Sequence, residues 1–269
     1  MGNSFIGKIN YILYFEVYER TYIMVKQLNI CAVVGTLHRK SNTEYFVHRF
    51  IEVFKEKTTY KVVSKIYNLN NYNINNCLGC YYCAKSNNCI LNDDMESIKN
   101  SMMQSDIIIW ATPVYMNNVS GIMKTFIDRL HIWTKVLFLS GKHNIVLSTS
   151  SHPGGDVYVQ DYLANILCSL GSINLGRYNM CLDLPMELYN TDRERVLLQA
   201  YVDMTINNIQ HDFLKPTPTH EIIFTSLRNQ INSLGDDNIV NNFILHYWKE
   251  KEMINCDSFQ QYLDKICKM

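Results

Sequence analysis

Four cysteines gather within the short run from Cys77 to Cys89. They are Cys77, Cys80, Cys83 and Cys89, at the spacing Cys-x2-Cys-x2-Cys-x5-Cys, in a chain of 269 residues with nine cysteines. Gaps of two residues let successive sulfurs turn toward one small object, and Gly79 lets the backbone bend sharply beside Cys80. A [4Fe–4S] cluster takes four thiolates, and a Cys-x2-Cys-x2-Cys run supplies three of them from one turn of chain. The spacing therefore predicts a [4Fe–4S] cluster at these four cysteines.

Other interpretations of the same four thiols stay open at this point. They could hold a structural zinc ion, form redox-active disulfides or remain reduced without a ligand. Structural zinc sites usually draw their ligands from two separated Cys-x2-Cys pairs rather than from three cysteines at equal close steps. The spacing therefore favours the cluster over zinc.

Composition narrows the class of protein and its surroundings. The formal net charge is zero, so charge gives no reason to expect a nucleic-acid or membrane partner, and hydrophobic residues at 47% are ample for a large core. The cysteines lack the spacing of a secreted disulfide scaffold, which favours a reducing, cytoplasmic location. The apolar stretch 9–17 is too short to span a bilayer. We expect residues 1–26 to be an N-terminal extension.

Short apolar runs alternate with helical patterns over residues 27–190. Strands are predicted at 29–34, 61–67, 106–111, 144–147 and 178–182, with helices between them, one of them over 119–133. Asp93-Asp-Met-Glu96 reads as a capping box at the start of another helix. This alternation predicts an α/β domain with a five-stranded parallel sheet in the order 2-1-3-4-5 and helices on both faces. Residues 191–269 read as a helical C-terminal extension that packs on the sheet domain or on another subunit.

Three polar loops follow predicted strands one, three and four: 35–43, 112–118 and 148–155. In the order 2-1-3-4-5 these loops converge on one crevice at the carboxyl edge of the sheet. In the first loop Ser41, Asn42 and Thr43 can cap the following helix, whose N-terminus favours a phosphate, and Arg39 or Lys40 can add charge. The pattern predicts an anion pocket at this edge.

Several motifs together resemble a known family. Gly35-Thr-Leu-His-Arg-Lys-Ser-Asn-Thr43 resembles the phosphate loop of flavodoxin-like NAD(P)H-dependent FMN reductases. The cysteine run followed by Asp93-Asp-Met95, Thr112-Pro-Val-Tyr115 and Lys124-Thr-Phe-Ile-Asp-Arg129 is similar to the iron–sulfur flavoprotein branch of that superfamily. The match covers roughly residues 28–185. It implies FMN at the carboxyl edge of the sheet, a [4Fe–4S] cluster on the cysteine motif, and a homodimer or homotetramer in which clusters and flavins of neighbouring subunits approach one another.

The resemblance also implies which residues bind the cofactors. FMN phosphate would be held by Thr36, Arg39, Ser41, Asn42 and Thr43; the isoalloxazine would lie along Pro113, Val114, Tyr115, Met116, Asn117 and Asn118, with Thr149, Ser150, Ser151 and Gly155 on the other side. No catalytic side chain is expected, because the flavin N5 is the reactive centre. Asp128 and Arg129 are expected to form structural ion pairs rather than to act in catalysis.

The function that these features favour is an FMN-dependent oxidoreductase, an iron–sulfur flavoprotein that passes electrons between a reduced donor, the cluster and FMN. Its partners would be small-molecule or protein electron donors and acceptors, with NAD(P)H as a candidate transient donor. One alternative is a cluster-free NAD(P)H-dependent reductase of FMN, quinones or nitro compounds. Another, from a different class, is a non-catalytic scaffold stapled by zinc.

Overall fold

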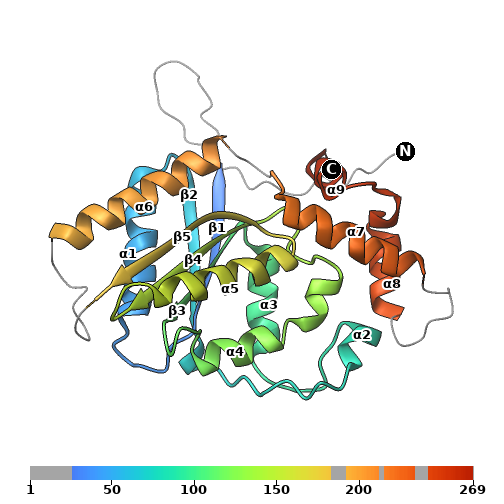
Figure 1. Ribbon diagram of the computed structural model, residues 1–269, viewed down its shortest axis with the longest axis horizontal. Coiled ribbons are helices and arrows are strands. Elements are labelled where there is room, and N and C mark those ends of the chain that lie inside the picture. Colours follow the sequence, from blue (N-terminus) through green and yellow to red (C-terminus); the bar gives the residue numbers. More distant parts are fainter. Residues whose placement is uncertain (1–25, 183–191, 212–214, 234–241, 269) are drawn as a thin grey trace, which may run out of the picture.

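The fold is built on one five-stranded parallel sheet. The structure is a computed structural model that describes residues 26–182, 192–211, 215–233 and 242–268. Its strands are β1 Gln27–Val34, β2 Lys61–Asn68, β3 Ile107–Pro113, β4 His143–Ser150 and β5 Ile173–Cys181, all parallel, in the order β2-β1-β3-β4-β5 (Figure 1). The predicted fold and strand order are confirmed. The N-terminal extension predicted for residues 1–26 lies almost wholly outside the described residues.

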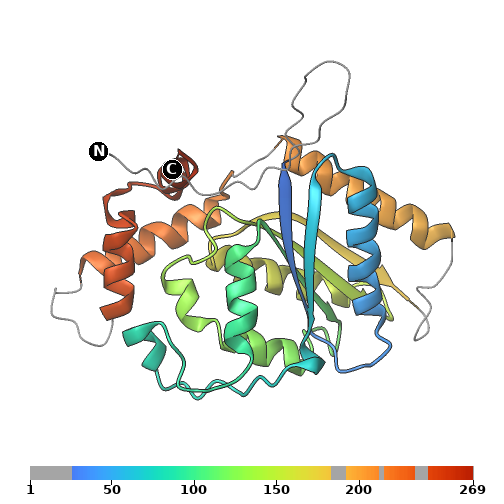
Figure 2. The same cartoon turned by 180° about the vertical axis from the view of Figure 1, so that it is seen from behind.

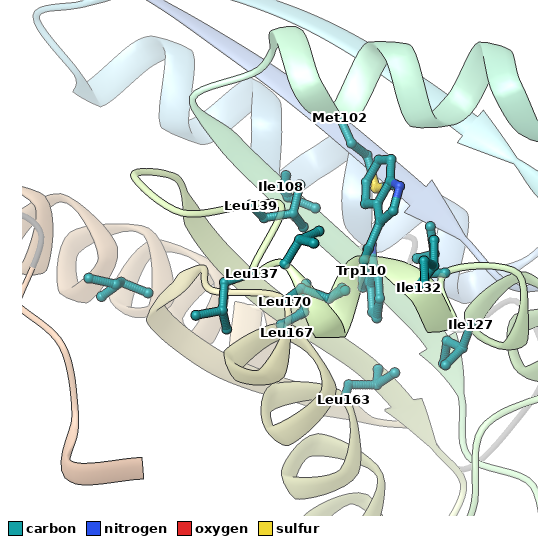
Figure 3. Close-up of a cluster of buried hydrophobic side chains, with 14 of the residues drawn as sticks. Met102, Ile108, Trp110, Ile127, Ile132, Leu137, Leu139, Leu163, Leu167 and Leu170 are labelled. Atoms are coloured by element: carbon teal, nitrogen blue, oxygen red, sulfur yellow. The ribbon is translucent and has the colours of Figure 1, made fainter. Parts of the chain in front are cut away.

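Helices cover both faces of the sheet (Figures 1 and 2). On one face, α1 Asn42–Lys57 and α6 Asp192–His211 pack on the strand side chains that include Ile30 and Ile109. On the other face lie α3 Met95–Gln104, α4 Gly121–Asp128 and α5 Gly155–Ser169. Alternate residues of each buried strand serve the two cores, as a pleated strand requires. Figure 3 shows the core on this second face, in which Trp110 of β3 lies among leucine and isoleucine side chains. They include Leu163 of α5 and Leu137 and Leu139 of the loop before β4.

The C-terminal helices extend this second core. They are α7 Pro218–Asn232, α8 Asn242–Glu250 and α9 Phe259–Lys268, with the short 3-10 helix η4 Met253–Asn255 between the last two. Phe224, Trp248 and Phe259 are fully buried in the same cluster as the side chains beneath α3 and α5. The prediction that this tail packs on the sheet domain is thereby confirmed. α6 belongs to the predicted C-terminal extension, yet it covers the same face of the sheet as α1. The domain boundary at residue 190 therefore stays a prediction.

Three local expectations need correction. β5 begins at Ile173 rather than at 178, because this edge strand buries alternate residues and has no continuous apolar run to mark its start. The helix expected over 119–133 ends at Asp128 and is followed by the 3-10 helix η2 His131–Lys135. The expected capping box is wrong. Asp94 caps α3 without a side-chain hydrogen bond, and the carboxylate of Asp93 is paired with Arg129.

Two short elements carry the segment between β2 and α3. The 3-10 helix η1 Leu69–Asn71 follows β2 directly, and the one-and-a-half-turn helix α2 Tyr82–Ser86 holds the third cysteine. In both views this segment runs away from the sheet, and α2 packs against α8 of the C-terminal tail (Figures 1 and 2). The cysteine segment is therefore placed by the tail as well as by the sheet domain.

Candidate functional site

A pocket of about 270 Å3 opens at the carboxyl edge of the sheet. The three loops that the sequence predicted to converge there do so, because β1, β3 and β4 are neighbours and end level with one another, with Pro113 beside Thr149 in the register. Its lining residues are Thr36, His38, Lys40, Ser41, Asn42, Thr43, Pro113, Val114, Tyr115, Thr149, Ser150, Ser151 and Leu182. Small polar residues form the largest group among these lining residues.

One end of the pocket is the N-terminus of α1. The Ser41 hydroxyl accepts hydrogen bonds from the backbone N–H groups of Thr43 and Glu44, which is a standard N-cap. The hydroxyls of Thr43 and Thr149 lie 2.6 Å apart and join this helix start to the end of β4. Asn42 Oδ1 is buried and has no hydrogen-bond partner among the described residues. Helix N–H groups and hydroxyls form a donor set suited to an anion such as a phosphate.

The opposite rim is a tight turn after β3. Tyr115 and Asn118 exchange two backbone hydrogen bonds of 2.9 Å, and Met116 and Asn117 between them take left-handed backbone conformations, with φ of 51° and 56°. The Val114 N–H donates to the Thr149 carbonyl at 2.8 Å and fixes the turn against β4. Tyr115 is 56% exposed and Met116 is 98% exposed. The rim therefore offers an aromatic ring beside the pocket, where a flat ligand ring could lie.

Buried groups behind the pocket hold its loops in register. Ser120 donates its hydroxyl hydrogen bond to the Gly35 carbonyl at 2.6 Å and accepts one from the Met123 N–H at 3.2 Å. A Cβ on Gly35 would lie 2.5 Å from Met123 Cβ, so this close approach requires glycine. Ser120 was not among the predicted site residues, although its position before the α4 pattern is that of an N-cap.

Not every predicted cofactor residue lines the pocket. The residues that do line it are Thr36, Ser41, Asn42, Thr43, Pro113, Val114, Tyr115, Thr149, Ser150 and Ser151. Those that do not are Arg39, Met116, Asn117, Asn118 and Gly155. Arg39 is exposed. Gly155 instead supports the turn, because a Cβ there would lie 2.6 Å from Asn117 Oδ1. His38, Lys40 and Leu182 complete the lining; Leu182 could not be assigned from a motif, since it follows the edge strand.

A second pocket, of about 360 Å3, is lined by all four cysteines of the run. Gly79, Tyr81 and Asn87 have φ of 65°, 56° and 60°, and these left-handed residues fold the segment back on itself. Tyr81 and Tyr82 are 61% and 46% exposed at its rim, so they cover it only partly. Its lining residues are Cys77, Leu78, Gly79, Cys80, Tyr81, Tyr82, Cys83, Cys89, Ile90, Leu91, Lys99, Asp128, Arg129 and His131.

The thiols in this pocket influence one another electrostatically. Burial raises the pKa of the Cys83 thiol, repulsion from Cys89 and Cys77 raises it further, and the backbone and the positive charge of Lys99 oppose the rise. A positively charged metal group bound here would stabilise the Cys83 thiolate and so offset the burial that disfavours it.

A buried ion pair anchors the wall of the cysteine pocket. Arg129 donates to both carboxylate oxygens of Asp93 and to the Asn75 carbonyl, and the two charged side chains are 2% and 1% exposed. Burial would raise the pKa of Asp93, but hydrogen bonds from Arg129 and from backbone N–H groups outweigh it and lower the pKa to about 2. Asp128 pairs with Lys124 one turn away on α4. Asp128 and Arg129 thus form the structural ion pairs that the sequence predicted.

The four cysteines can be compared with the ligand sets of a single metal ion and of a cluster. Among the residues that the structure describes, no three His, Cys, Asp or Glu side chains lie close enough together to hold one metal ion. Four thiolates on one tetrahedral zinc ion would have sulfurs only about 3.8 Å apart. In a [4Fe–4S] cluster each thiolate binds a different iron, so the sulfurs stand farther apart around a larger object. All four cysteines line one pocket, as the ligands of such a cluster would.

The fold is that of solved flavin-dependent oxidoreductases. The chain resembles the apo form of an NADH:FMN oxidoreductase, with a TM-score of 0.52 and 19% identity over 72% of this chain and 93% of that one. It also resembles an NAD(P)H:quinone oxidoreductase from Methanothermobacter marburgensis, with a TM-score of 0.53 and 14% identity over 69% and 98% of the two chains. At these identities the likeness shows the fold alone, which is flavodoxin-like, as predicted.

The sequence comparison identifies the family. The family model described as NADPH-dependent FMN reductase matches residues 28–183, and the chain belongs to this family. Among curated relatives, it is 35% identical to an iron–sulfur flavoprotein of Archaeoglobus fulgidus over 38% of this chain and 47% of that protein. It is 28% identical to an iron–sulfur flavoprotein of Clostridioides difficile over 54% and 64%. The matches thus span less than two thirds of these relatives. The family and branch that the motifs indicated are confirmed.

No helix in the described part of the chain is both long enough and apolar enough to cross a membrane.

Proposed function

We propose that this protein is an FMN-dependent oxidoreductase that passes electrons between a reduced donor, a [4Fe–4S] cluster and FMN. The observation that carries the proposal is the presence, in one chain, of two separate pockets. One is an anion-binding pocket at the carboxyl edge of a flavodoxin-like sheet, and the other is lined by all four cysteines of a compact motif. The names of its curated relatives support the pairing of the two cofactors.

The edge pocket would hold FMN. Thr36, Ser41, Asn42 and Thr43 would bind the phosphate at the N-terminus of α1, where helix N–H groups can donate to it. Tyr115 and the backbone of the turn after β3 would bear on the isoalloxazine. The pocket is slightly below the usual range of about 300–1,000 Å3 for ligand sites. Part of the flavin would therefore project beyond it, accessible to a donor such as NAD(P)H.

The cysteine pocket would hold the cluster through Cys77, Cys80, Cys83 and Cys89. FMN, when bound, supplies the exchange of one or two electrons, and a [4Fe–4S] cluster supplies the exchange of single electrons. The protein's part is to position the two groups, to keep the cluster thiolates ordered through the Asp93–Arg129 pair, and to exclude bulk water from the buried side of each pocket.

The two pockets have no lining residue in common. Electrons would therefore pass over a gap within one chain or between neighbouring subunits, and we propose a homodimer or homotetramer in which the cluster of one subunit approaches the flavin of another. The cytoplasm, where thiols stay reduced, is the proposed location.

Cofactor analysis of anaerobically purified protein tests the proposal. We expect a brown protein with about four iron atoms and about one FMN per chain. A yellow protein with FMN but no iron, in which Cys80→Ser leaves NAD(P)H oxidation unchanged, would establish the cluster-free reductase instead. One zinc per chain without FMN would establish the scaffold and overturn the proposal.

A further inference from the structure

A buried lysine lies beside the four cysteines. Lys99 is on α3, is 3% exposed, and lines the cysteine pocket as well as the smaller polar pocket of about 300 Å3 that adjoins it at Cys89. Its ammonium group has one carboxylate within ion-pairing distance among the described residues. That carboxylate is Glu96, whose Oε2 is 3.8 Å away and whose side chain is 59% exposed. A long, solvent-facing pair of this kind compensates a buried charge only weakly.

Aromatic side chains hold Lys99 in place. Its Nζ lies 5.6 Å from the centre of the Trp133 ring. Trp133 stacks on Phe138 with ring centres 4.6 Å apart, and Phe138 stacks on Tyr247 of α8 at 5.3 Å. The stack ties the lysine to the C-terminal tail. A cation–π contact supplies part of the lost hydration, but a buried ammonium ion also needs a nearby anion.

The second cation in this wall is already neutralised. Arg129 also lines the cysteine pocket, but the buried carboxylate of Asp93 is paired with it at 2.5 Å. Its positive charge is thus largely cancelled within the wall. Lys99 is the pocket cation whose charge the described carboxylates compensate least, so its field acts mainly on whatever occupies the pocket.

We propose that Lys99 raises the reduction potential of the [4Fe–4S] cluster in the cysteine pocket, which makes the cluster a better electron acceptor. This inference rests on the proposed function. Reduction adds one electron to the cluster and one negative charge with it, while no bond to Lys99 forms or breaks and the ammonium keeps its protons. A fixed positive charge in the wall of the same poorly hydrated pocket stabilises the more negative form.

Three variants test the proposal. Lys99→Met removes the charge at similar length, Lys99→Arg keeps it, and Lys85→Met removes an exposed lysine from α2, within the cysteine run but outside the pocket lining. Replacing a poorly paired buried charge with an apolar side chain is generally tolerated by the fold. The measurement is the midpoint potential of the cluster in anaerobically reconstituted protein, from a dye-mediated titration followed by electron paramagnetic resonance, with iron content determined alongside.

We expect Lys99→Met to weaken the electron affinity of the cluster at least tenfold, a downward shift of about 59 mV or more for a one-electron couple. Lys99→Arg should restore most of the wild-type potential. Lys85→Met should have a much smaller effect, because water and salt screen an exposed charge. Iron content should match the wild type in all three.

Two results would overturn the proposal. One is a Lys99→Met potential within the shift seen for Lys85→Met. The other is loss of iron from both Lys99→Met and Lys99→Gln while Lys99→Arg retains it, which would make Lys99 necessary for assembly rather than for the potential. Absence of iron from the wild-type protein would instead contradict the proposed function itself, so the two failures can be told apart.

Discussion

The two pockets of this protein are built in different ways. The edge pocket is made from the ends of β1, β3 and β4 and the start of α1, with backbone groups and short hydroxyl side chains as its donors. The cysteine pocket lies on a folded-back segment between β2 and α3, held by a buried ion pair and by helix α8 of the tail. The position of the first pocket follows from the sheet, whereas that of the second depends on side chains far apart in the sequence. The two should therefore respond differently to substitution.

The largest effect should come from breaking the ion pair behind the cysteine pocket. Arg129→Leu leaves the Asp93 carboxylate buried without its partner, and such changes destabilise proteins by about 3–5 kcal/mol. The measurement is the free energy of unfolding from denaturant titration, with iron retention recorded on the same protein. The matched control, Lys124→Leu, breaks the exposed pair with Asp128 and should change stability by about 0.5 kcal/mol or less. Equal effects of the two substitutions would mean that the pair does not support the cysteine pocket.

Gly35→Ala should mainly affect the edge pocket. The added methyl group would meet Met123 Cβ at 2.5 Å, and overpacking of this kind costs about 1–3 kcal/mol. Because the strain falls where β1 leads into the proposed phosphate loop, FMN affinity should fall while iron content stays unchanged. Gly121→Ala is the control, since no atom lies within 4 Å of a Cβ at that position. If Gly35→Ala lowered iron content as much as flavin affinity, the two pockets would not be independent.

Thr43→Val should have the most local effect of the three, on FMN binding rather than on the fold. It preserves shape but removes the hydroxyl that bonds to Thr149 and faces the proposed phosphate position. Hydrogen bonds to charged groups contribute about 1.5–3 kcal/mol, so FMN binding should weaken by about tenfold or more. Flavin fluorescence titration of the apoprotein measures this. Thr58→Val, at the opposite end of α1, should leave the affinity unchanged. An unaltered FMN affinity in Thr43→Val would contradict a phosphate position at the N-terminus of α1.

This contrast also explains what the sequence could predict. Buried strands leave continuous apolar runs, and polar loops follow them, so the sheet order and the three converging loops were accessible from local pattern alone. The Asp93–Arg129 pair joins residues 36 positions apart, and the local pattern around Asp93 favoured a capping box instead. Only the tertiary contact decided between the two.

The sequence around Lys99 indicates that this residue lies on the inward face of a helix, but not what it contacts there. It lies four residues after Met95 and three before Met102, both buried in the core, so helical spacing places it on the inward face of α3. A lysine at such a position usually reaches the surface along its stem. That the surrounding pocket is the one formed by the cysteines follows only from the fold of the 77–89 segment.

The most direct test of two independent cofactor pockets is the FMN and iron content of Cys80→Ser, purified anaerobically beside Cys267→Ser, which alters an exposed cysteine of α9 outside the pocket. We expect Cys80→Ser to lose most of its iron and to keep its full complement of FMN, with Cys267→Ser like the wild type in both. Undiminished iron in Cys80→Ser, or parallel loss of FMN and iron, would contradict the account.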